Sequence, residues 1–448
     1  MRVYLLVMLV AAAVTFLATP FARWVALRTG AITAVRDRDV HTIPTPRLGG
    51  LAMLLGLVVA VVFASQMPFL ESVFVGEVAG QMVADARIWG IVGAAAIVCL
   101  LGIADDIWDL DWMTKLAGQV LAAGLMASQG VVLFTLPIPI GEQQLIWSSR
   151  LQLVATILVV VVAMNAVNFV DGLDGLAAGL VAIGGAAFFV YSYVLTQKAS
   201  ADDYSSLATL VIAALVGICV GFLPHNFHPA RIFMGDSGSM VLGLVFSAAA
   251  IVVTGRVDTT TLSGAQQIPA FIPLLLPLAV ILLPLLDMAM AVVRRVARGK
   301  SPFHPDRMHL HHRMLAIGHS HRRAVLILYV WTAVFAFAAV ALVQWHWHGV
   351  AAGLAVAVVA AALLTLGPLR TRGRFLDDDA AAAVDVPPVL APPTSSAPGS
   401  SDPAASSAVP TPPKEALTAR PVAYTHRRAR ETCAEGGCRR RGERPGRG

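Results

Sequence analysis

The fold is decided by a stretch that reads LQLVATILVVVVAMNAVNFVDGLDGLAAGL over residues 151–180. The run 151–168 is apolar until Asn165 and Asn168, and a second apolar run starts after Gly175. A run of about 18 apolar residues is long enough to cross a bilayer as a helix. Between the runs lie two Asp-Gly pairs, and glycine permits the tight turns that reverse a chain. The stretch therefore predicts two membrane helices joined by a short acidic turn.

Long apolar runs with short polar breaks extend over most of the 448 residues. Apolar residues make up 57% of the chain and charged residues 13%, whereas a soluble domain has about 25% charged residues. We expect an all-α, polytopic membrane protein with about eleven transmembrane helices. They are predicted near residues 3–20, 48–66, 88–104, 114–131, 151–168, 175–196, 207–223, 239–255, 271–293, 324–343 and 348–367.

Basic residues indicate which membrane face each loop occupies, because short basic loops stay in the cytoplasm. The first apolar run is followed by Arg23, Arg28, Arg36, Arg38 and Arg47, with no convincing signal-peptide cleavage site between. The predicted loop near 294–323 is also rich in arginine. We therefore expect a protein of the cell (inner or plasma) membrane, with its N-terminus outside and its C-terminus in the cytoplasm. This orientation puts all the polar clusters described below on the cytoplasmic side.

The composition changes near the end of the chain. Residues 371–448 are rich in Ala, Pro, Ser and Arg and contain few large apolar residues. Such a segment cannot bury enough apolar surface to offset the entropy lost on ordering it. We expect a transmembrane domain over residues 1–370 and a disordered cytoplasmic tail over residues 371–448.

The first acidic cluster contains Asp105, Asp106 and Asp109, directly after an apolar run. Asp105 and Asp109 are spaced to share one face of a helix. Clustered carboxylates repel one another unless protons or a cation compensate, and Mg²⁺ commonly binds one or two carboxylates together with substrate phosphates. Lys115, just beyond, is a candidate phosphate ligand. A solvated acidic loop is the alternative interpretation.

Amides and carboxylates gather where the run 151–168 ends. Asn165 and Asn168 are costly inside a membrane unless they have polar partners. Asp171 and Asp174 each precede a glycine, so that a ligand can approach the backbone closely. Their carboxylates suit a base N–H, a ribose hydroxyl or a metal, and the next helix presents its N-terminus to anions. A plain turn with helix caps is the alternative.

A second glycine-rich turn reads Phe233-Met-Gly-Asp236-Ser-Gly-Ser239 and precedes an apolar run. Asp236 is a candidate metal ligand, and the alternative is a simple helix N-cap. Phe233 is suited to stacking on a base, and Asn226 lies in the polar stretch before it. The turn therefore predicts a second part of the same phosphate or nucleotide site.

The most basic loop contains His309, His311, His312 and Arg313. Histidine and arginine together suit a phosphate, because arginine binds phosphate oxygens through two N–H groups. Zinc is the competing ligand, but no thiolate and no helical histidine pair accompanies these residues. The loop is therefore predicted to bind phosphate.

In their order and content, these clusters resemble the polyprenyl-phosphate N-acetylhexosamine-1-phosphate transferases, a family of the glycosyltransferase 4 type, over about residues 1–370. They look most similar to the branch that transfers N-acetylglucosamine-1-phosphate to undecaprenyl or decaprenyl phosphate. The resemblance implies a Mg²⁺ enzyme, with Mn²⁺ as a substitute, that uses UDP-N-acetylglucosamine and a polyprenyl phosphate and releases UMP. It implies no nucleic-acid partner and is compatible with a homodimer.

The resemblance also implies roles for single residues. Catalytic roles are implied for Asp105, Asp106, Asp171, His309, His311, His312 and Arg313. Substrate binding is implied for His41, Arg47, Lys115, Asn165, Asn168, Asp174, Asn226 and Phe233. Metal binding is implied for Asp106 and Asp236. Direct attack by the lipid phosphate, with Asp105 taking its remaining proton, and a covalent carboxylate intermediate both stay open.

Two other functions stay open as well. The sister branch, which transfers phospho-N-acetylmuramoyl-pentapeptide, typically has three consecutive histidines where this chain has His309-Leu-His311-His312-Arg313. A secondary transporter places ionisable groups near the membrane midplane, on broken helices. In this sequence only Asp287 and the proline-containing run 271–293 favour a transporter.

Overall fold

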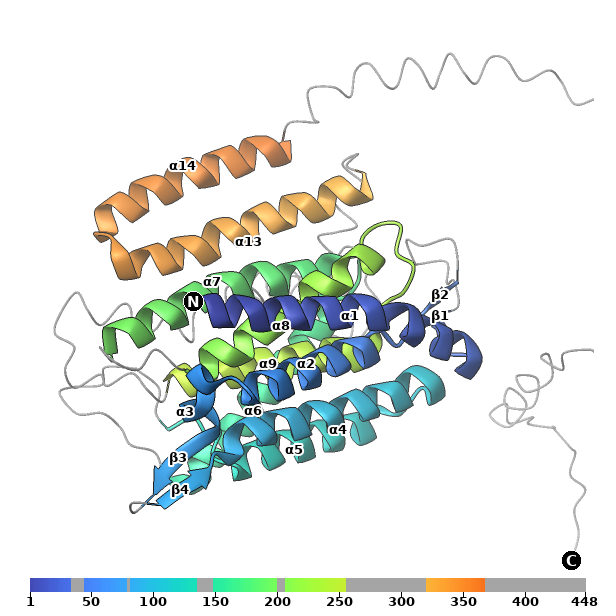
Figure 1. Ribbon diagram of the computed structural model, residues 1–448. Coiled ribbons are helices and arrows are strands. Elements are labelled where there is room, and N and C mark those ends of the chain that lie inside the picture. The colour runs from blue at the N-terminus through green and yellow to red at the C-terminus, as the bar shows by residue number, and fades with distance from the viewer. Residues whose placement is uncertain (34–43, 79–80, 135–147, 200–205, 255–319, 367–448) are drawn as a thin grey trace, which may run out of the picture. The chain divides into compact units, whose positions relative to one another are not determined.

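The computed structural model describes residues 1–33, 44–78, 81–134, 148–199, 206–254 and 320–366, and this part of the chain is almost entirely helical (Figure 1). Its helices are α1 (Arg2–Thr29), α2 (Gly49–Ser65), η1 (Pro68–Leu70), α3 (Glu71–Phe74), α4 (Ala86–Trp108), α5 (Trp112–Ser128), α6 (Ser149–Val170), α7 (Leu176–Ala199), α8 (Leu207–Asn226), α9 (Gly235–Thr254), α13 (His321–Gln344) and α14 (Trp347–Leu366). Two antiparallel hairpins join β1 (Ile32–Thr33) to β2 (Thr45–Pro46) and β3 (Val75–Val78) to β4 (Gln81–Ala84). The predicted run 271–293 and the predicted tail lie outside the described residues.

The predicted all-α membrane fold is confirmed. Among the described residues, the helices long and apolar enough to cross a membrane are α1, α4, α6, α7, α8, α9, α13 and α14. α2 forms a ninth candidate with η1 and α3, from which it is bent by 96°. α5 has 17 residues, just under the length of about 18 needed for a span. The hairpins were not predicted.

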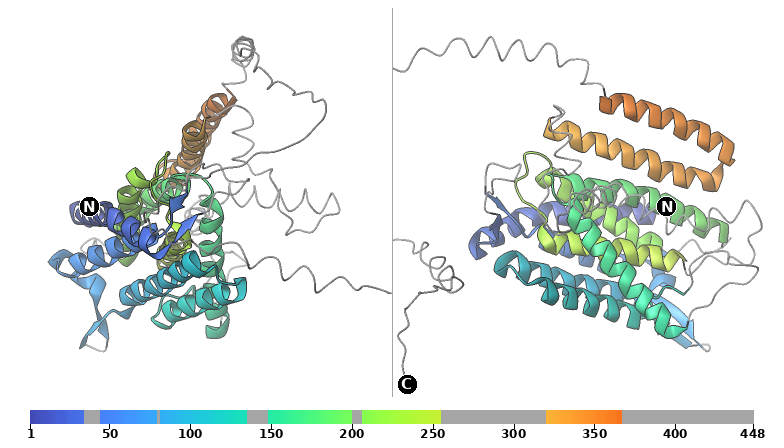
Figure 2. Two further views of the ribbon diagram at one scale, coloured as in Figure 1. Left: turned by 90° about the vertical axis from the view of Figure 1, so that its right-hand side faces the viewer. Right: turned by 180° about the vertical axis from the view of Figure 1, so that it is seen from behind.

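α8 and α9 form the centre of the bundle. α1, α2 and α7 pack on α8, while α2, α4 and α6 pack on α9. α5 lies against α4 and α6, and α13 packs between α7 and α14. Figure 2 shows the α13–α14 pair projecting from the rest of the bundle. The site described below is therefore built around the starts and ends of the central helices.

Glycines allow the central helices to approach one another closely. A Cβ on Gly217 of α8 would lie 2.4 Å from the Met8 carbonyl oxygen of α1. A Cβ on Gly50 of α2 would lie 2.3 Å from the backbone nitrogen of Gly238 in α9. Small residues at crossings are typical of membrane bundles, where close packing rather than burial from water holds the helices together. The first turns of α2 and α9 are therefore held in backbone contact.

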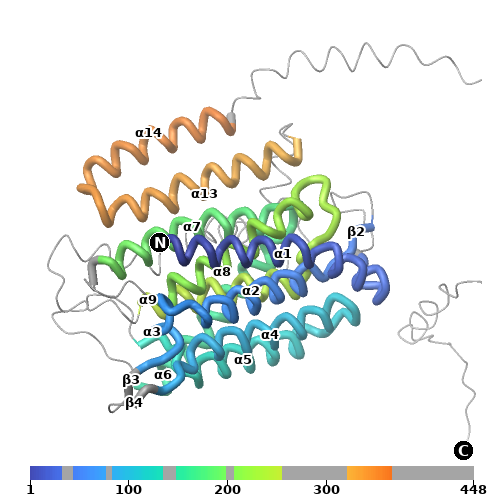
Figure 3. The backbone as a smooth tube through the Cα atoms, viewed as in Figure 1, coloured from blue at the N-terminus to red at the C-terminus, as the bar shows by residue number. Residues whose placement is uncertain are grey.

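Because the helices alternate in direction, the polar connections gather at one end of the bundle, on the right in Figures 1 and 3. This end, which we call the site end, contains the end of α1, the start of α2, the α4–α5, α6–α7 and α8–α9 connections and the start of α13. The predicted clusters around Arg47, Asp105, Asp171 and Asp236 all lie there. The predicted common placement is confirmed for these four clusters, while the cluster from His309 to Arg313 lies outside the described residues. The membrane face that the site end occupies stays a prediction.

Candidate active site

Asp106, in the last turn of α4, binds the first turn of α9. Its Oδ1 accepts from the Asp236 backbone N–H (3.3 Å), and its Oδ2 accepts from the backbone N–H (3.4 Å) and the hydroxyl (3.2 Å) of Ser237. Gly235 has a φ of +68°, and a Cβ there would lie 2.3 Å from Asp106 Oδ2, so that only glycine fits. Negative charge is favourable at a helix N-terminus, where N–H groups lack partners within the helix. Asp106 therefore fixes α4 against α9.

The Asp236 carboxylate connects α9 to α5 and α6. Lys115 of α5 donates to Asp236 Oδ2, and its Nζ also lies 2.8 Å from Asp105 Oδ2. Asn168 of α6 donates to Asp236 Oδ1 (2.9 Å) and to the Ser239 hydroxyl (2.9 Å). Asp236 is thus more than a cap of its own helix, because its side chain contacts two other predicted site residues.

Asp171 directly follows α6, and its backbone N–H donates to the Asn168 carbonyl (3.2 Å). Burial, followed by the negative charges of Asp236 and Asp106, raises the pKa of the Asp171 carboxyl to about 7, against an opposing effect of Arg47. A carboxyl whose pKa lies near 7 is suited to proton transfer at neutral pH. The acidic cluster therefore contains one carboxyl whose pKa suits it to accept a proton at neutral pH.

Carboxylates outnumber cationic side chains among the described residues of this cluster. Lys115 stands between two of the carboxylates and so marks a position that favours positive charge. Gathering carboxylates at partly buried positions is unfavourable unless cations offset them. Mg²⁺ prefers oxygen ligands, and oxygens of this kind are supplied by Asp105, Asp106 and Asp236. The donor set therefore fits a divalent cation.

Arg47 and Phe233 are brought together through their backbones. They form an isolated parallel bridge, in which the Phe233 N–H donates to the Pro46 carbonyl (2.8 Å). The charge of Arg47 also acts on the carboxyls of Asp106 and Asp171, so its guanidinium is within electrostatic range of the acidic cluster. Both side chains are partly exposed. The pairing places a cation and an aromatic ring at the edge of the site.

Two predicted binding residues make internal hydrogen bonds. Asn165 donates to Gln119 Oε1 (2.8 Å), deeper in the bundle. Asn226 is 1% exposed; its Oδ1 accepts from the Gly175 N–H (3.1 Å) and its amide donates to the Ile232 carbonyl (3.0 Å). Asn226 thereby holds the α6–α7 turn against the α8–α9 loop. In this structure both asparagines position other groups.

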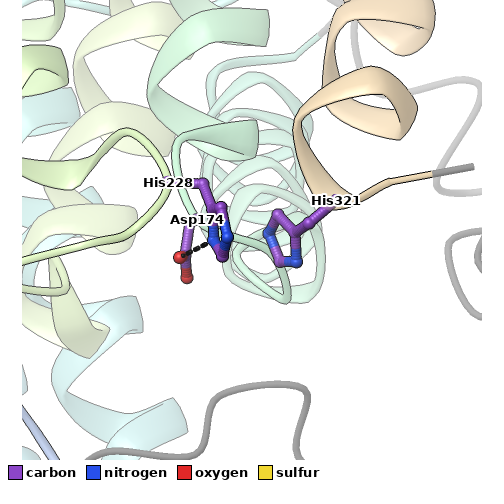
Figure 4. A group of neighbouring side chains, drawn as sticks. All are labelled: Asp174, His228 and His321. Atoms are coloured by element: carbon purple, nitrogen blue, oxygen red, sulfur yellow. Dashed lines mark hydrogen bonds and ion pairs between the residues drawn. The ribbon is translucent and has the colours of Figure 1, made fainter.

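Asp174 is paired with histidines that the sequence analysis did not identify (Figure 4). Its Oδ2 lies 2.7 Å from His228 Nδ1 and accepts from the Ala230 N–H (3.1 Å). The ring of His321, the first residue of α13, stacks on His228 with 4.3 Å between centroids. His228 was visible in the polar stretch before Phe233, but the proximity of His321 follows only from the tertiary structure.

The remaining predicted site residues cannot be placed. His41, His309, His311, His312 and Arg313 lie outside the described part of the chain. Their predicted roles in phosphate and sugar binding therefore stay predictions. The acidic cluster, Arg47 and Phe233 are the part of the predicted site that the structure brings together.

Comparison with known proteins identifies relatives over most of the chain. The family model described as glycosyl transferase family 4 matches residues 88–254, which extend from α4 to the end of α9. The chain is 43% identical over 374 residues to the decaprenyl-phosphate N-acetylglucosaminephosphotransferase of Mycolicibacterium smegmatis, covering 83% of this chain and 90% of that relative. It is 31% identical over 319 residues to a probable undecaprenyl-phosphate N-acetylglucosaminyl 1-phosphate transferase of Bacillus subtilis, covering 71% and 78%. A phospho-N-acetylmuramoyl-pentapeptide-transferase of Desulforudis audaxviator is 30% identical over 310 residues, covering 65% and 82%.

Proposed function

Because the chain belongs to glycosyl transferase family 4, we propose that it transfers N-acetylglucosamine-1-phosphate from UDP-N-acetylglucosamine to a membrane polyprenyl phosphate. The products are polyprenyl-diphospho-N-acetylglucosamine and UMP, and the lipid product begins a cell-envelope polysaccharide. The observation that carries the proposal is the acidic cluster around Asp236, with Lys115 and Arg47, at one end of a membrane bundle. A phosphate held in a lipid leaflet and a water-soluble nucleotide sugar can meet at such a place.

The reaction brings two polyanions together. An oxygen of the lipid phosphate attacks the β-phosphorus of UDP-N-acetylglucosamine, and the bond from that phosphorus to the bridging oxygen breaks. UMP leaves with the electron pair of that bond. Positive charge around the phosphates offsets their repulsion and stabilises the transition state. Lys115 and Arg47 supply such charge from α5 and from the segment before α2.

We assign Mg²⁺, with Mn²⁺ as a substitute, to the carboxylates of Asp106 and Asp236, with Asp105 beside them. The backbone amides of Asp236 and Ser237 hold Asp106, and Asn168 holds Asp236. Ligands oriented in this way by hydrogen bonds support a defined metal geometry. When bound, the cation neutralises phosphate charge in the transition state.

We assign to Asp171 the acceptance of the remaining proton of the lipid phosphate, because its raised pKa of about 7 suits a proton acceptor. Direct attack is favoured over a covalent intermediate. Asp105 accepts from the Leu110 N–H (3.1 Å) and pairs with Lys115. Asp106 and Asp236 likewise use both carboxylate oxygens. A carboxylate whose oxygens accept hydrogen bonds or bind a cation is a weaker nucleophile.

The proposal places the site end in the cytoplasm, where UDP-sugars are made, and assigns uracil stacking to Phe233. The histidine-rich loop and His41 are assigned to the diphosphate and the sugar. The described site residues all come from one chain, so a homodimer is compatible with the proposal but is not required by it. A transporter is disfavoured because the charged cluster of the described residues lies at one end of the bundle, away from its middle.

Purified protein in lipid nanodiscs tests the proposal directly. Polyprenyl phosphate and Mg²⁺ are supplied with either UDP-N-acetylglucosamine or UDP-N-acetylmuramoyl-pentapeptide at equal concentration, and UMP release is measured. We expect UMP only with the first donor and only when the lipid phosphate is present. Turnover with the pentapeptide donor alone would show that the protein has the activity of the sister branch. Absence of UMP with both donors, from monodisperse protein, would contradict the reaction itself.

A further inference from the structure

Asp174, His228 and His321 bring possible metal-ligand atoms within 4.8 Å of one another, from three separate segments (Figure 4). Asp174 lies in the α6–α7 turn, His228 in the α8–α9 loop and His321 at the start of α13. The imidazole rings stack with an interplanar angle of 17°, and Asp174 Oδ2 lies 2.7 Å from His228 Nδ1. We refer to these three residues as the Asp174 cluster.

His321 lacks the partners that a buried imidazole needs. Neither of its ring nitrogens is exposed, and neither has a hydrogen-bond partner among the described residues. A buried polar nitrogen without a partner is unfavourable, and such a group usually indicates a missing water, ion or ligand. Figure 4 shows the His321 ring directed toward His228 and Asp174. The missing partner is therefore expected on the side where the other two ligands lie.

An ion pair alone does not account for the cluster. A protonated His228 would satisfy Asp174, but it would leave His321 without a partner. Protonation of both rings would place like charges 4.3 Å apart between centroids, which is unfavourable. A metal cation resolves both difficulties, because it binds neutral imidazoles through their lone pairs and also balances the carboxylate.

We propose that the Asp174 cluster binds a transition-metal cation, Zn²⁺ in the first instance, at a site separate from the Mg²⁺ carboxylates. Imidazole ligands suit Zn²⁺, whereas Mg²⁺ prefers oxygen. Two histidines with one carboxylate form a recognised three-ligand zinc set that leaves a further position for water. Bonds of about 2.1 Å to zinc place ligand atoms about 3.4 Å apart. This spacing lies between the 2.7 Å from Asp174 Oδ2 to His228 Nδ1 and the 4.8 Å within which all the ligand atoms lie.

The surroundings of the cluster are built to orient these ligands. Asp174 Oδ2 accepts from the Ala230 N–H (3.1 Å), and the His228 carbonyl accepts from Arg322 Nε (3.0 Å). Tyr329 of α13 donates to the Gly175 carbonyl, next to Asp174. Hydrogen bonds to residues that bind a metal directly commonly orient those residues and tune metal affinity. α13 is thus already connected to both ligand-bearing loops.

The bound cation ties the start of α13 to the two loops at the site end. It fixes Asp174, one of the predicted substrate-binding residues, and anchors the chain eight residues after Arg313. By holding these three segments together, the cation affects where the histidine-rich loop can reach. The proposal does not depend on the transferase assignment, because it predicts metal binding by the protein without any substrate.

Metal binding to full-length protein, purified with a tag that contains no histidine and stripped with chelator, tests the proposal. We expect one tightly bound Zn²⁺ per chain by elemental analysis, a rise in Tm on adding Zn²⁺ but not Mg²⁺, and visible absorption bands when Co²⁺ replaces Zn²⁺. His228→Gln and His321→Gln should each weaken Zn²⁺ binding by about 100-fold or more, since they remove a ligand rather than its support. They should also abolish the Co²⁺ bands.

Two further variants distinguish this site from other histidines. His225→Gln is the matched control, because His225 lies three residues before His228 but contacts the Phe16 carbonyl (3.2 Å) instead of the cluster. It should bind Zn²⁺ as the wild type does. His311→Gln examines the histidine-rich loop. Loss of zinc in His311→Gln but not in His321→Gln would overturn the proposal, as would stripped wild-type protein that takes up no zinc. Stripped variants with the Tm of the stripped wild type show that folding is intact.

Discussion

The two oxygens of Asp236 serve different partners, which makes this residue the sharpest test of the site. Oδ2 receives the Lys115 ammonium and Oδ1 receives the Asn168 amide (2.9 Å). Asp236→Asn keeps the size of the side chain but removes its charge and its value as a metal ligand. We expect Mg²⁺-dependent turnover to fall by about 10³-fold or more, equivalent to about 4 kcal/mol of transition-state stabilisation. UMP release by the purified variant measures this.

Asp111→Asn is the matched control at the same end of the bundle. Asp111 caps α5 by accepting from the backbone N–H groups of Met113 (2.9 Å) and Thr114 (3.1 Å). Asparagine caps helices about as well as aspartate, so turnover should stay near that of the wild type. Equal rates for the two variants would show that Asp236 is not a metal ligand and serves only at the start of its helix.

The pH dependence of turnover should report Asp171. The pKa of a free aspartate is about 3.9, whereas that of Asp171 is raised to about 7. Only the ionised form accepts a proton, so kcat/KM should rise with pH as this carboxyl ionises. Bound Mg²⁺ offsets the charges of Asp106 and Asp236, so the midpoint measured with Mg²⁺ should lie below 7. Asp171→Asn should lose this acidic limb together with most of the rate.

The same shift predicts how stability changes with pH. Between about pH 4 and pH 7 the unfolded chain has lost this proton and the folded chain retains it, so Asp171 lowers the free energy of unfolding as pH rises. Asp171→Asn should therefore flatten this part of the stability profile, measured by unfolding in detergent. An acidic limb in kcat/KM that persists unchanged in Asp171→Asn would assign proton transfer to another group.

At the scale of helices, the contact between α4 and α9 is what presents Asp106 to the α9 N-terminus. A Cβ on Gly102 would lie 2.3 Å from the Ser237 Cα and backbone nitrogen. Gly102→Ala should therefore force α4 away from α9 and lengthen the bonds from Asp106 to the α9 amides. Overpacking of this kind costs about 1–3 kcal/mol, and we expect a lower Tm together with a lower turnover.

Gly93→Ala, on the same helix, separates this packing effect from a general effect of replacing glycine. A Cβ on Gly93 would meet Leu125 Cδ2 at 3.8 Å, an ordinary van der Waals contact. Alanine also favours the helix by about 1 kcal/mol relative to glycine. The Tm of Gly93→Ala should equal or exceed that of the wild type, with turnover unchanged. Similar losses in both variants would remove the special role of Gly102.

The length and polarity of the elements could be predicted from sequence more fully than their contacts. Apolar runs located the described spans, and the motifs predicted the family, which is confirmed. Asp109 was expected to share a helical face with Asp105, but it ends α4 with a φ of 53° and is exposed. The hairpin β3–β4 falls in an expected loop, because four-residue strands leave too short a pattern.

Contacts between distant residues explain why parts of the site could not be predicted. Lys115 and Asp236 are 121 positions apart, and Asn226 contacts Gly175 across 51. Each residue was identified as polar and close to a helix end, which motif reading can do. Whether its side chain faces a ligand or a neighbouring backbone depends on how helices cross. Asn226 was therefore expected to bind substrate, although the structure gives both ends of its amide backbone partners.

For the molecule as a whole, the membrane face of the site end is the main prediction to check. Ser320 and His346 flank α13 at opposite ends and are both exposed. In a background without the native cysteines, His346→Cys should react with an impermeant thiol reagent in intact cells. Ser320→Cys should react only after the membrane is permeabilised. The reverse pattern would invert the orientation and place the acidic cluster outside the cell.

The contrast between α9 and α14 has a consequence for how this chain can change over generations. In an apolar 18-residue window of α9 all the residues are buried in protein, whereas in the corresponding window of α14 11% of them are. Lipid accepts almost any apolar side chain, so α14 can exchange leucine, valine and alanine freely while keeping its overall hydropathy. Each α9 side chain must instead match the shapes of several neighbours. We therefore expect the sequence of α9 to be strongly conserved during evolution and that of α14 to accumulate apolar substitutions.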